Sequence, residues 1–148
     1  MNDSVLRPPQ GKTANMANAA PATARWSVGG LLLEAIAERH FLKMADCFEP
    51  DATMRALLPS GSAEFHGAAQ IVDRFRQWFG DAERFEVLDG TVGDVGDRLY
   101  LAWKLRMRPN LRIDDHWQII EQHSYARANE RIAALDLLCS GFVPERRA

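Results

Sequence analysis

The sequence has few cysteines, no long apolar run and no leader pattern, and each shortage excludes a class of protein. The two cysteines, Cys47 and Cys139, lie far apart in apolar surroundings, which predicts two buried free thiols rather than a disulfide framework. No apolar stretch is long enough to span a bilayer, and residues 1–24 lack the apolar core of a signal peptide. We therefore expect a cytoplasmic protein that does not bind membranes.

The motifs that usually mark a cofactor or a catalytic nucleophile are missing as well. The sequence has no glycine-rich phosphate loop, no nucleophile elbow around a serine and no zinc signature. The run Asp114-Asp115-His116 lacks partners at metal-ligand spacing. The 18 Lys and Arg are scattered among 20 Asp and Glu, and the net charge of −2 gives no basic surface for nucleic acid. We expect no cofactor, no metal and no nucleic-acid partner.

What is present is the composition of a single globular domain. Hydrophobic residues make up 47% of the 148 positions and charged residues 26%, which is enough to form a hydrophobic core without stabilising cross-links. Residues 1–25 are rich in alanine and proline and have no aromatic side chain, so we predict a flexible tail. The domain is expected to begin near Trp26, with Ser27 capping the first helix.

Hydrophobic spacing predicts three helices and six strands. The first helix follows Ser27, a second runs over Phe41–Phe48 and ends before Pro50, and a third covers Ala68–Phe79. Extended patterns occupy Asp51–Pro59, Ala63–His66, Phe85–Val95 and Arg98–Arg108, and two more strands follow within Trp117–Val143. This order indicates an α+β fold with the helices on one side of a curved antiparallel sheet.

Three stretches of the chain resemble a known family. They are DCFEPDAT at residues 46–53, the helix opening Gly67-x-x-x-Ile71-x-x-x-Phe75, and the final strand pair. Together they resemble the nuclear transport factor 2-like superfamily, and within it the SnoaL-like proteins of polyketide cyclase and ketosteroid isomerase type, over residues 26–144. The resemblance implies a cone-shaped barrel of cystatin-like topology, in which a curved antiparallel sheet wraps around three helices and leaves an apolar cavity. It also implies a homodimer formed through the outer sheet face.

The same resemblance argues against steroid isomerase chemistry. At the positions of that enzyme's general-base Asp, oxyanion-hole Asp and oxyanion-hole Tyr, this sequence has Ala56, Gln122 and Leu32. Ketosteroid isomerase is a standard worked case of a base acting with two proton donors, and all three groups are absent here. We therefore assign no reaction.

Strand parity divides the residues of the last two strands between the cavity and the outside. Gln118, Ile120, Gln122 and Ser124 are expected to face the cavity, as are Ala133, Leu135, Leu137 and Cys139. Trp117, Ile119, Glu121, His123 and Tyr125 are expected to point outwards, where their apolar members favour a homodimer interface. The predicted pocket wall consists of Ala56, Phe75, Trp78, Phe79, Trp103, Gln118, Gln122, Ser124, Leu135, Leu137 and Cys139.

A few acid–base side chains remain as catalytic candidates, each with a simpler alternative. Glu64 and His66 share one face of the predicted hairpin, which is otherwise a solvated edge. Asp46 either points into the cavity mouth or faces water, and His40 caps or follows the first helix. Glu121 with His123 forms either an oriented base or an interface hydrogen bond.

Two functions are consistent with this sequence. The first is a SnoaL-like pocket protein that binds an apolar, polycyclic or polyketide-like small molecule, oriented by Gln122 and Ser124. The second is a non-catalytic homodimeric binding module whose cavity is filled by its own side chains. Missing acid–base groups favour the second function, and polar groups inside an apolar wall favour the first.

Overall fold

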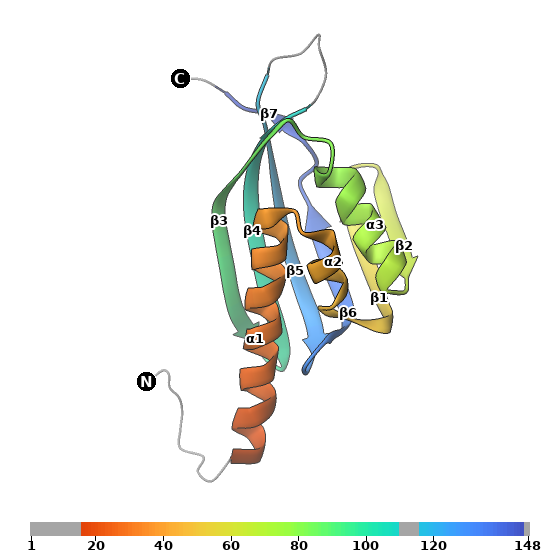
Figure 1. The fold of residues 1–148 in the computed structure, drawn as a ribbon, viewed down its shortest axis with the longest axis vertical. Coiled ribbons are helices and arrows are strands. Elements are labelled where there is room, and N and C mark those ends of the chain that lie inside the picture. Colours follow the sequence, from red (N-terminus) through yellow and green to blue (C-terminus); the bar gives the residue numbers. More distant parts are fainter. Residues whose placement is uncertain (1–15, 110–115, 147–148) are drawn as a thin grey trace.

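The computed structural model describes residues 16–109 and 116–146 and contains three helices on one face of a curved sheet (Figure 1). The helices are α1 (Met16–Glu38), α2 (Phe41–Ala45) and α3 (Ala68–Phe79). The strands are β1 (Phe48–Leu58), β2 (Gly61–His66), β3 (Arg84–Val95), β4 (Arg98–Arg108), β5 (Gln118–Ala128), β6 (Ile132–Cys139) and β7 (Val143–Pro144). The predicted α+β class is confirmed.

The sheet has the strand order β2-β1-β6-β5-β4-β3, with β7 added beside β5. All pairings are antiparallel except β1 with β6, so the sheet is mixed rather than wholly antiparallel as the sequence suggested. No hairpin joins β1 to β6, and therefore no turn dictates their relative direction. The sheet is curved but not closed, because β2 and β3 form its two edges. The cone is therefore an open one.

Helix α1 begins earlier than the sequence indicated. It starts at Met16 instead of near Ser27, so part of the predicted tail is helical, while the part over residues 1–15 lies outside the described residues. Arg25 and Trp26 both reach Asp94 at the end of β3, with the Trp26 indole Nε1 2.8 Å from a carboxylate oxygen. This contact attaches the helix to the sheet at the predicted domain start.

The short α2 also differs from its predicted range. It ends at Ala45 because Phe48 already belongs to β1, and Pro50 lies within that strand rather than ending a helix. Pro50 is tolerated there because the β1–β6 ladder shifts register between Phe48 and Thr53. His40 follows α1, as expected, and it also caps α2 by accepting the Lys43 backbone N–H at 3.1 Å.

The core fills the space between the helices and the concave sheet face. Helix α3 has its predicted bounds and buries a stripe of bulky side chains, Ile71, Val72, Phe75 and Phe79. Strand β4 also has its predicted bounds, and its alternation is confirmed by the buried set Leu99, Leu101, Trp103, Leu105 and Met107. No helix within residues 16–109 and 116–146 combines the length and apolar character needed to cross a membrane.

Candidate functional site

Of the three polar side chains expected inside the cone, Gln122 and Ser124 are buried and already bonded to protein groups, whereas Gln118 is half-buried. The Trp103 indole N–H donates to Gln122 Oε1 at 2.6 Å, and the Gln122 amide nitrogen donates to Cys139 Sγ at 3.3 Å. Ser124 Oγ donates to the Leu101 carbonyl at 2.9 Å. Gln122 and Ser124 both have 0% exposure. Their inward orientation matches the parity prediction, and their bonds are those of structural core residues.

The rest of the predicted wall is packed in a similar way. Phe75 makes ring contacts with Trp78, Phe79 and Trp103 at centroid distances of 5.3, 6.0 and 6.1 Å. Six members expose 2% of their surface or less, namely Ala56, Phe75, Phe79, Trp103, Leu135 and Leu137, whereas Trp78, Gln118 and Cys139 are half-buried. Ala133 is exposed rather than inward, because the β5–β6 ladder shifts register near Ala128.

The catalytic candidates lie on different elements. His40 is occupied as the cap of α2, and Asp46 at the end of that helix is exposed. Glu64 and His66 form the predicted pair on edge strand β2, with 3.6 Å between His66 Nε2 and the Glu64 carboxylate and both side chains mostly exposed. Asp114 and Asp115 lie outside the described residues, and the residues that are described contain no group of three metal-ligating side chains.

The sheet face away from the helices, here called the outer face, carries an unbroken row of polar and aromatic side chains. Cross-strand register places Tyr100, Tyr125, Asp136, Arg55 and Glu64 side by side across β4, β5, β6, β1 and β2. Arg55 Nε donates to Asp136 at 2.9 Å, and Arg98 donates to the other carboxylate oxygen at 3.2 Å. The Arg55 hydrogen bond, followed by that of Arg98, lowers the pKa of Asp136.

The predicted Glu121–His123 pair is also on the outer face. His123 Nε2 lies 2.7 Å from the Glu121 carboxylate, and His123 Nδ1 lies 2.6 Å from the Tyr100 hydroxyl. Desolvation, with the charges of Tyr125 and Glu121, raises the pKa of Tyr100. Since both nitrogens of the imidazole are bonded to protein groups, His123 offers no free base to a ligand.

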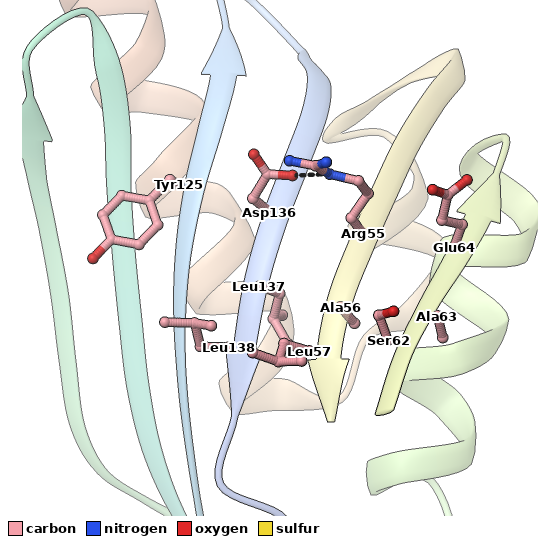
Figure 2. Close-up of a pocket in the computed structure, with 10 residues that line it drawn as sticks. All are labelled: Arg55, Ala56, Leu57, Ser62, Ala63, Glu64, Tyr125, Asp136, Leu137 and Leu138. Atoms are coloured by element: carbon pink, nitrogen blue, oxygen red, sulfur yellow. Dashed lines mark hydrogen bonds and ion pairs between the residues drawn. The ribbon is translucent and has the colours of Figure 1, made fainter. Parts of the chain in front are cut away.

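Two depressions on this face flank one apolar pair, Leu57 of β1 and Leu138 of β6, which are direct cross-strand partners. We call the two depressions together the outer groove. One has a volume of about 440 Å³ and is lined by Arg55, Ser62, Glu64, Tyr125 and Asp136 around the leucines (Figure 2). The other, of about 500 Å³, continues past the leucines to Leu58, Pro59, Glu121, His123 and Ser140.

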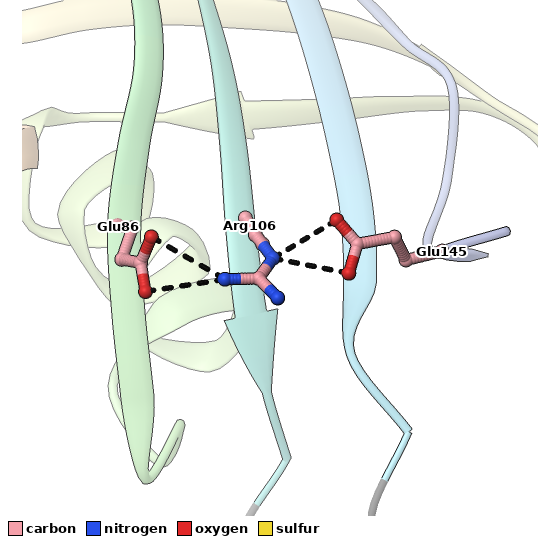
Figure 3. Close-up of polar contacts among 3 residues, drawn as sticks. All are labelled: Glu86, Arg106 and Glu145. Atoms are coloured by element: carbon pink, nitrogen blue, oxygen red, sulfur yellow. Dashed lines mark hydrogen bonds and ion pairs between the residues drawn. The ribbon is translucent and has the colours of Figure 1, made fainter. Parts of the chain in front are cut away.

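A separate cluster secures the C-terminal segment to the outer face. Arg106 Nε donates to Glu145 at 2.9 Å, and its Nη1 reaches Glu86 at 3.4 Å (Figure 3). The guanidinium also lies 3.7 Å from the centre of the Trp117 ring. Strand β7, just before Glu145, pairs with β5. Trp117, which we expected to contribute to a dimer interface, is thus partly covered by Arg106 of its own chain.

The outer groove was not predicted from the sequence, although strand alternation shows which side chains point to the outer face. Parity placed Tyr125 outside, but an exposed strand face gave no sign of a depression. Alternation along β1 and β6 indicates that Leu57 and Leu138 face outwards. Their pairing depends on the parallel β1–β6 register, which local sequence does not encode.

No family model and no curated protein matches this sequence. Solved structures do match. A putative polyketide cyclase from Xanthomonas campestris has a TM-score of 0.62 at 14% identity, covering 78% of this chain and 90% of that one. A putative SnoaL-like polyketide cyclase from Shewanella putrefaciens has a TM-score of 0.61 at 8% identity (78% and 88% covered). A protein of unknown function from Burkholderia xenovorans, described as NTF-2 like, has a TM-score of 0.57 at 15% identity (86% and 89% covered).

Proposed function

We propose that this protein, which has the fold of nuclear transport factor 2-like proteins, is a small-molecule-binding protein that holds an apolar ligand in the outer groove. The observation that carries the proposal is the groove itself. The depression over Leu57 and Leu138 has a volume of about 440 Å³, within the range of roughly 300–1,000 Å³ that small-molecule sites occupy. Its floor is apolar and its rim carries a few polar groups, the usual composition of such a site.

The groove is favoured over the predicted interior site because of accessibility. Leu57 and Leu138 are 55% and 47% exposed, so a ligand can cover them without moving the protein. Gln122 and Ser124 instead have no exposed surface and are bonded to neighbours. A ligand at Gln122 would first have to displace core side chains, at a cost of several kcal/mol.

We propose binding and no reaction. A general base needs a free lone pair within reach of the ligand, but His123 has both ring nitrogens engaged and Asp136 is held by two arginines. Glu64 and His66 lie at the sheet edge, and both side chains are mostly exposed to solvent.

The test is a fluorescence titration with the uncharged apolar probe N-phenyl-1-naphthylamine. We expect wild type to bind it and Leu138→Glu to weaken binding at least about tenfold, because a carboxylate in the groove must be desolvated by the probe. Leu42→Glu is the matched control, since Leu42 is 78% exposed on α2, away from the outer face. Equal binding by wild type and Leu138→Glu would place the site elsewhere.

A homodimer through the outer face is the second candidate, and one observation favours it. Five strands at about 4.8 Å spacing and about ten residues long at about 3.3 Å each give a face of roughly 800 Å², the area that each partner contributes to a standard interface. Half-buried Tyr100, Tyr125 and Ile119 lie on it beside exposed Val143.

Sedimentation velocity over micromolar concentrations tests this second candidate. A dimer that Leu138→Glu converts to monomer would support it, whereas a wild-type monomer at the highest concentration would end it. A dimer would also agree with the binding module whose interior is filled by its own side chains, the alternative drawn from the sequence.

A further inference from the structure

We infer that the outer groove selects an apolar molecule with a carboxylate headgroup, and that Arg55 receives this headgroup; the inference rests on the proposed function. The groove has an arginine at one end of an apolar floor. An amphipathic anion, with an acid at one end and an alkyl or aryl body, matches that polarity.

Arg55 presents unoccupied donors to the groove. Its Nε donates to Asp136 at 2.9 Å, while its two terminal nitrogens have no partner within the described part of the chain. Its side chain is 70% exposed, so a ligand can reach these nitrogens. Two terminal guanidinium nitrogens bind carboxylates in a forked geometry that an ammonium group cannot reproduce.

Asp136 positions the arginine. The carboxylate accepts from Arg55 on one oxygen and from Arg98 on the other, at 2.9 and 3.2 Å. It therefore holds Arg55 over strand β6, above the leucine pair, instead of leaving the side chain free in solvent (Figure 2). Ordering the side chain in advance reduces the entropy lost when a ligand binds.

The arginines outnumber the carboxylates at this end of the groove, as the binding of a carboxylate headgroup requires. Arg127 follows Tyr125 on the same face of β5 and is exposed, which adds a third arginine to Arg55 and Arg98. The opposing carboxylates are Asp136 and Glu64. Since Asp136 is already shared by two guanidinium groups, Glu64 is the group that a bound carboxylate would meet as an unfavourable charge.

The other end of the groove suits an apolar body. From Arg55 the floor runs along β1 through Leu57 to Leu58 and Pro59, a length of about 13 Å at about 3.3 Å per residue. Leu138 widens this floor from β6. A medium-length alkyl chain fits along it with its acid at Arg55.

The experiment compares octanoate, octan-1-ol and octylammonium, which share a chain length and differ in headgroup charge, by isothermal titration calorimetry at pH 7. We expect octanoate to bind about fivefold or more tightly than the other two, with the preference shrinking as salt rises. Arg55→Met should remove the preference while keeping alkyl-chain binding, because methionine preserves an apolar stem. Glu64→Gln should strengthen octanoate binding about two- to fivefold.

Arg76→Met is the control, since Arg76 is an exposed arginine paired with an aspartate on α3, and it should leave the preference intact. Equal affinity for the three probes, or tighter binding of octylammonium, would overturn the headgroup assignment while leaving the groove as a binding site. Binding of none of them would overturn the proposed function as well. A dimer that Leu138→Glu separates and that octanoate does not affect would mean that a second copy occupies the groove, which also overturns the inference.

Discussion

Replacing Gln122 by leucine tests whether the buried amide is a structural element of the sheet. In the native core its oxygen accepts the Trp103 indole N–H at 2.6 Å, and both side chains are buried. An indole N–H can only donate, so leucine leaves it without a partner in an apolar interior. An unpaired buried donor costs about 1–3 kcal/mol. The leucine side chain offsets part of this cost by burying apolar surface, and we expect the free energy of unfolding to fall by about 1–2 kcal/mol.

Urea unfolding followed by tryptophan fluorescence measures this loss, which corresponds to a fall in Tm of roughly 2–8 °C for a domain of this size. Gln118→Leu is the matched control on the same strand, because Gln118 is only half-buried; we expect a change within about 0.5 kcal/mol. The double variant Trp103→Phe with Gln122→Leu removes donor and acceptor together. Its cost should fall short of the summed single costs by about 1–2 kcal/mol.

Additive effects of Trp103→Phe and Gln122→Leu would refute this reasoning, because they would mean that the two side chains do not bond in solution. A Gln122→Leu variant of unchanged stability that loses ligand binding would contradict it from the other side. In that case Gln122 would face a ligand inside the cone, as the sequence first suggested.

Three further perturbations follow from individual contacts. The pKa of Asp136 is lowered in the folded state, so this carboxylate stabilises the protein above its ordinary pKa of 3.8. That stability is lost as the pH falls through the folded-state pKa. Asp136→Asn should therefore cost about 1 kcal/mol or less at pH 7 and nothing in acid, as measured by urea unfolding across pH. Burial raises the pKa of Cys47 to about 11, so iodoacetamide at pH 8 should alkylate half-exposed Cys139 first. Mass spectrometry that showed Cys47 to be labelled as fast as Cys139 would contradict this. Gly141 has φ +77°, and an added Cβ would lie 2.7 Å from Pro59 Cγ. Gly141→Ala should therefore cost about 1–3 kcal/mol by thermal unfolding, and an unchanged Tm would show that Gly141 does not lie against Pro59 in this conformation.

Much of the fold follows from local patterns that the structure confirms. Strand β4 alternates between large apolar and mixed side chains, and its apolar members are buried, because successive residues of a strand face opposite sides. The parallel β1–β6 pairing was not predicted, since it joins segments that are distant in sequence. The early start of α1 was missed because residues 16–25 include Pro21 and no aromatic side chain, a composition typical of a flexible tail.

The candidate site shows where sequence reasoning reaches its limit. Parity correctly placed Gln122 and Ser124 inside, but a polar residue on an inner face is compatible with a ligand and with a structural bond alike. The identity of the partner, Trp103, depends on the β4–β5 register. Similarly, alternation along β6 puts Leu138 on the outer face, but its role in the outer groove depends on Leu57 across the parallel pair. Long-range register decides both questions.

The most direct test of the proposed site is a methyl NMR titration of the leucine-labelled protein with octanoate. If the ligand occupies the outer groove, the methyl resonances of Leu57 and Leu138 will shift in a saturable manner. Those of buried Leu135 on the helix side and of exposed Leu42 on α2 will not. Saturable shifts at Leu135, with Leu57 and Leu138 unchanged, would place the ligand inside the cone and contradict the outer-groove site.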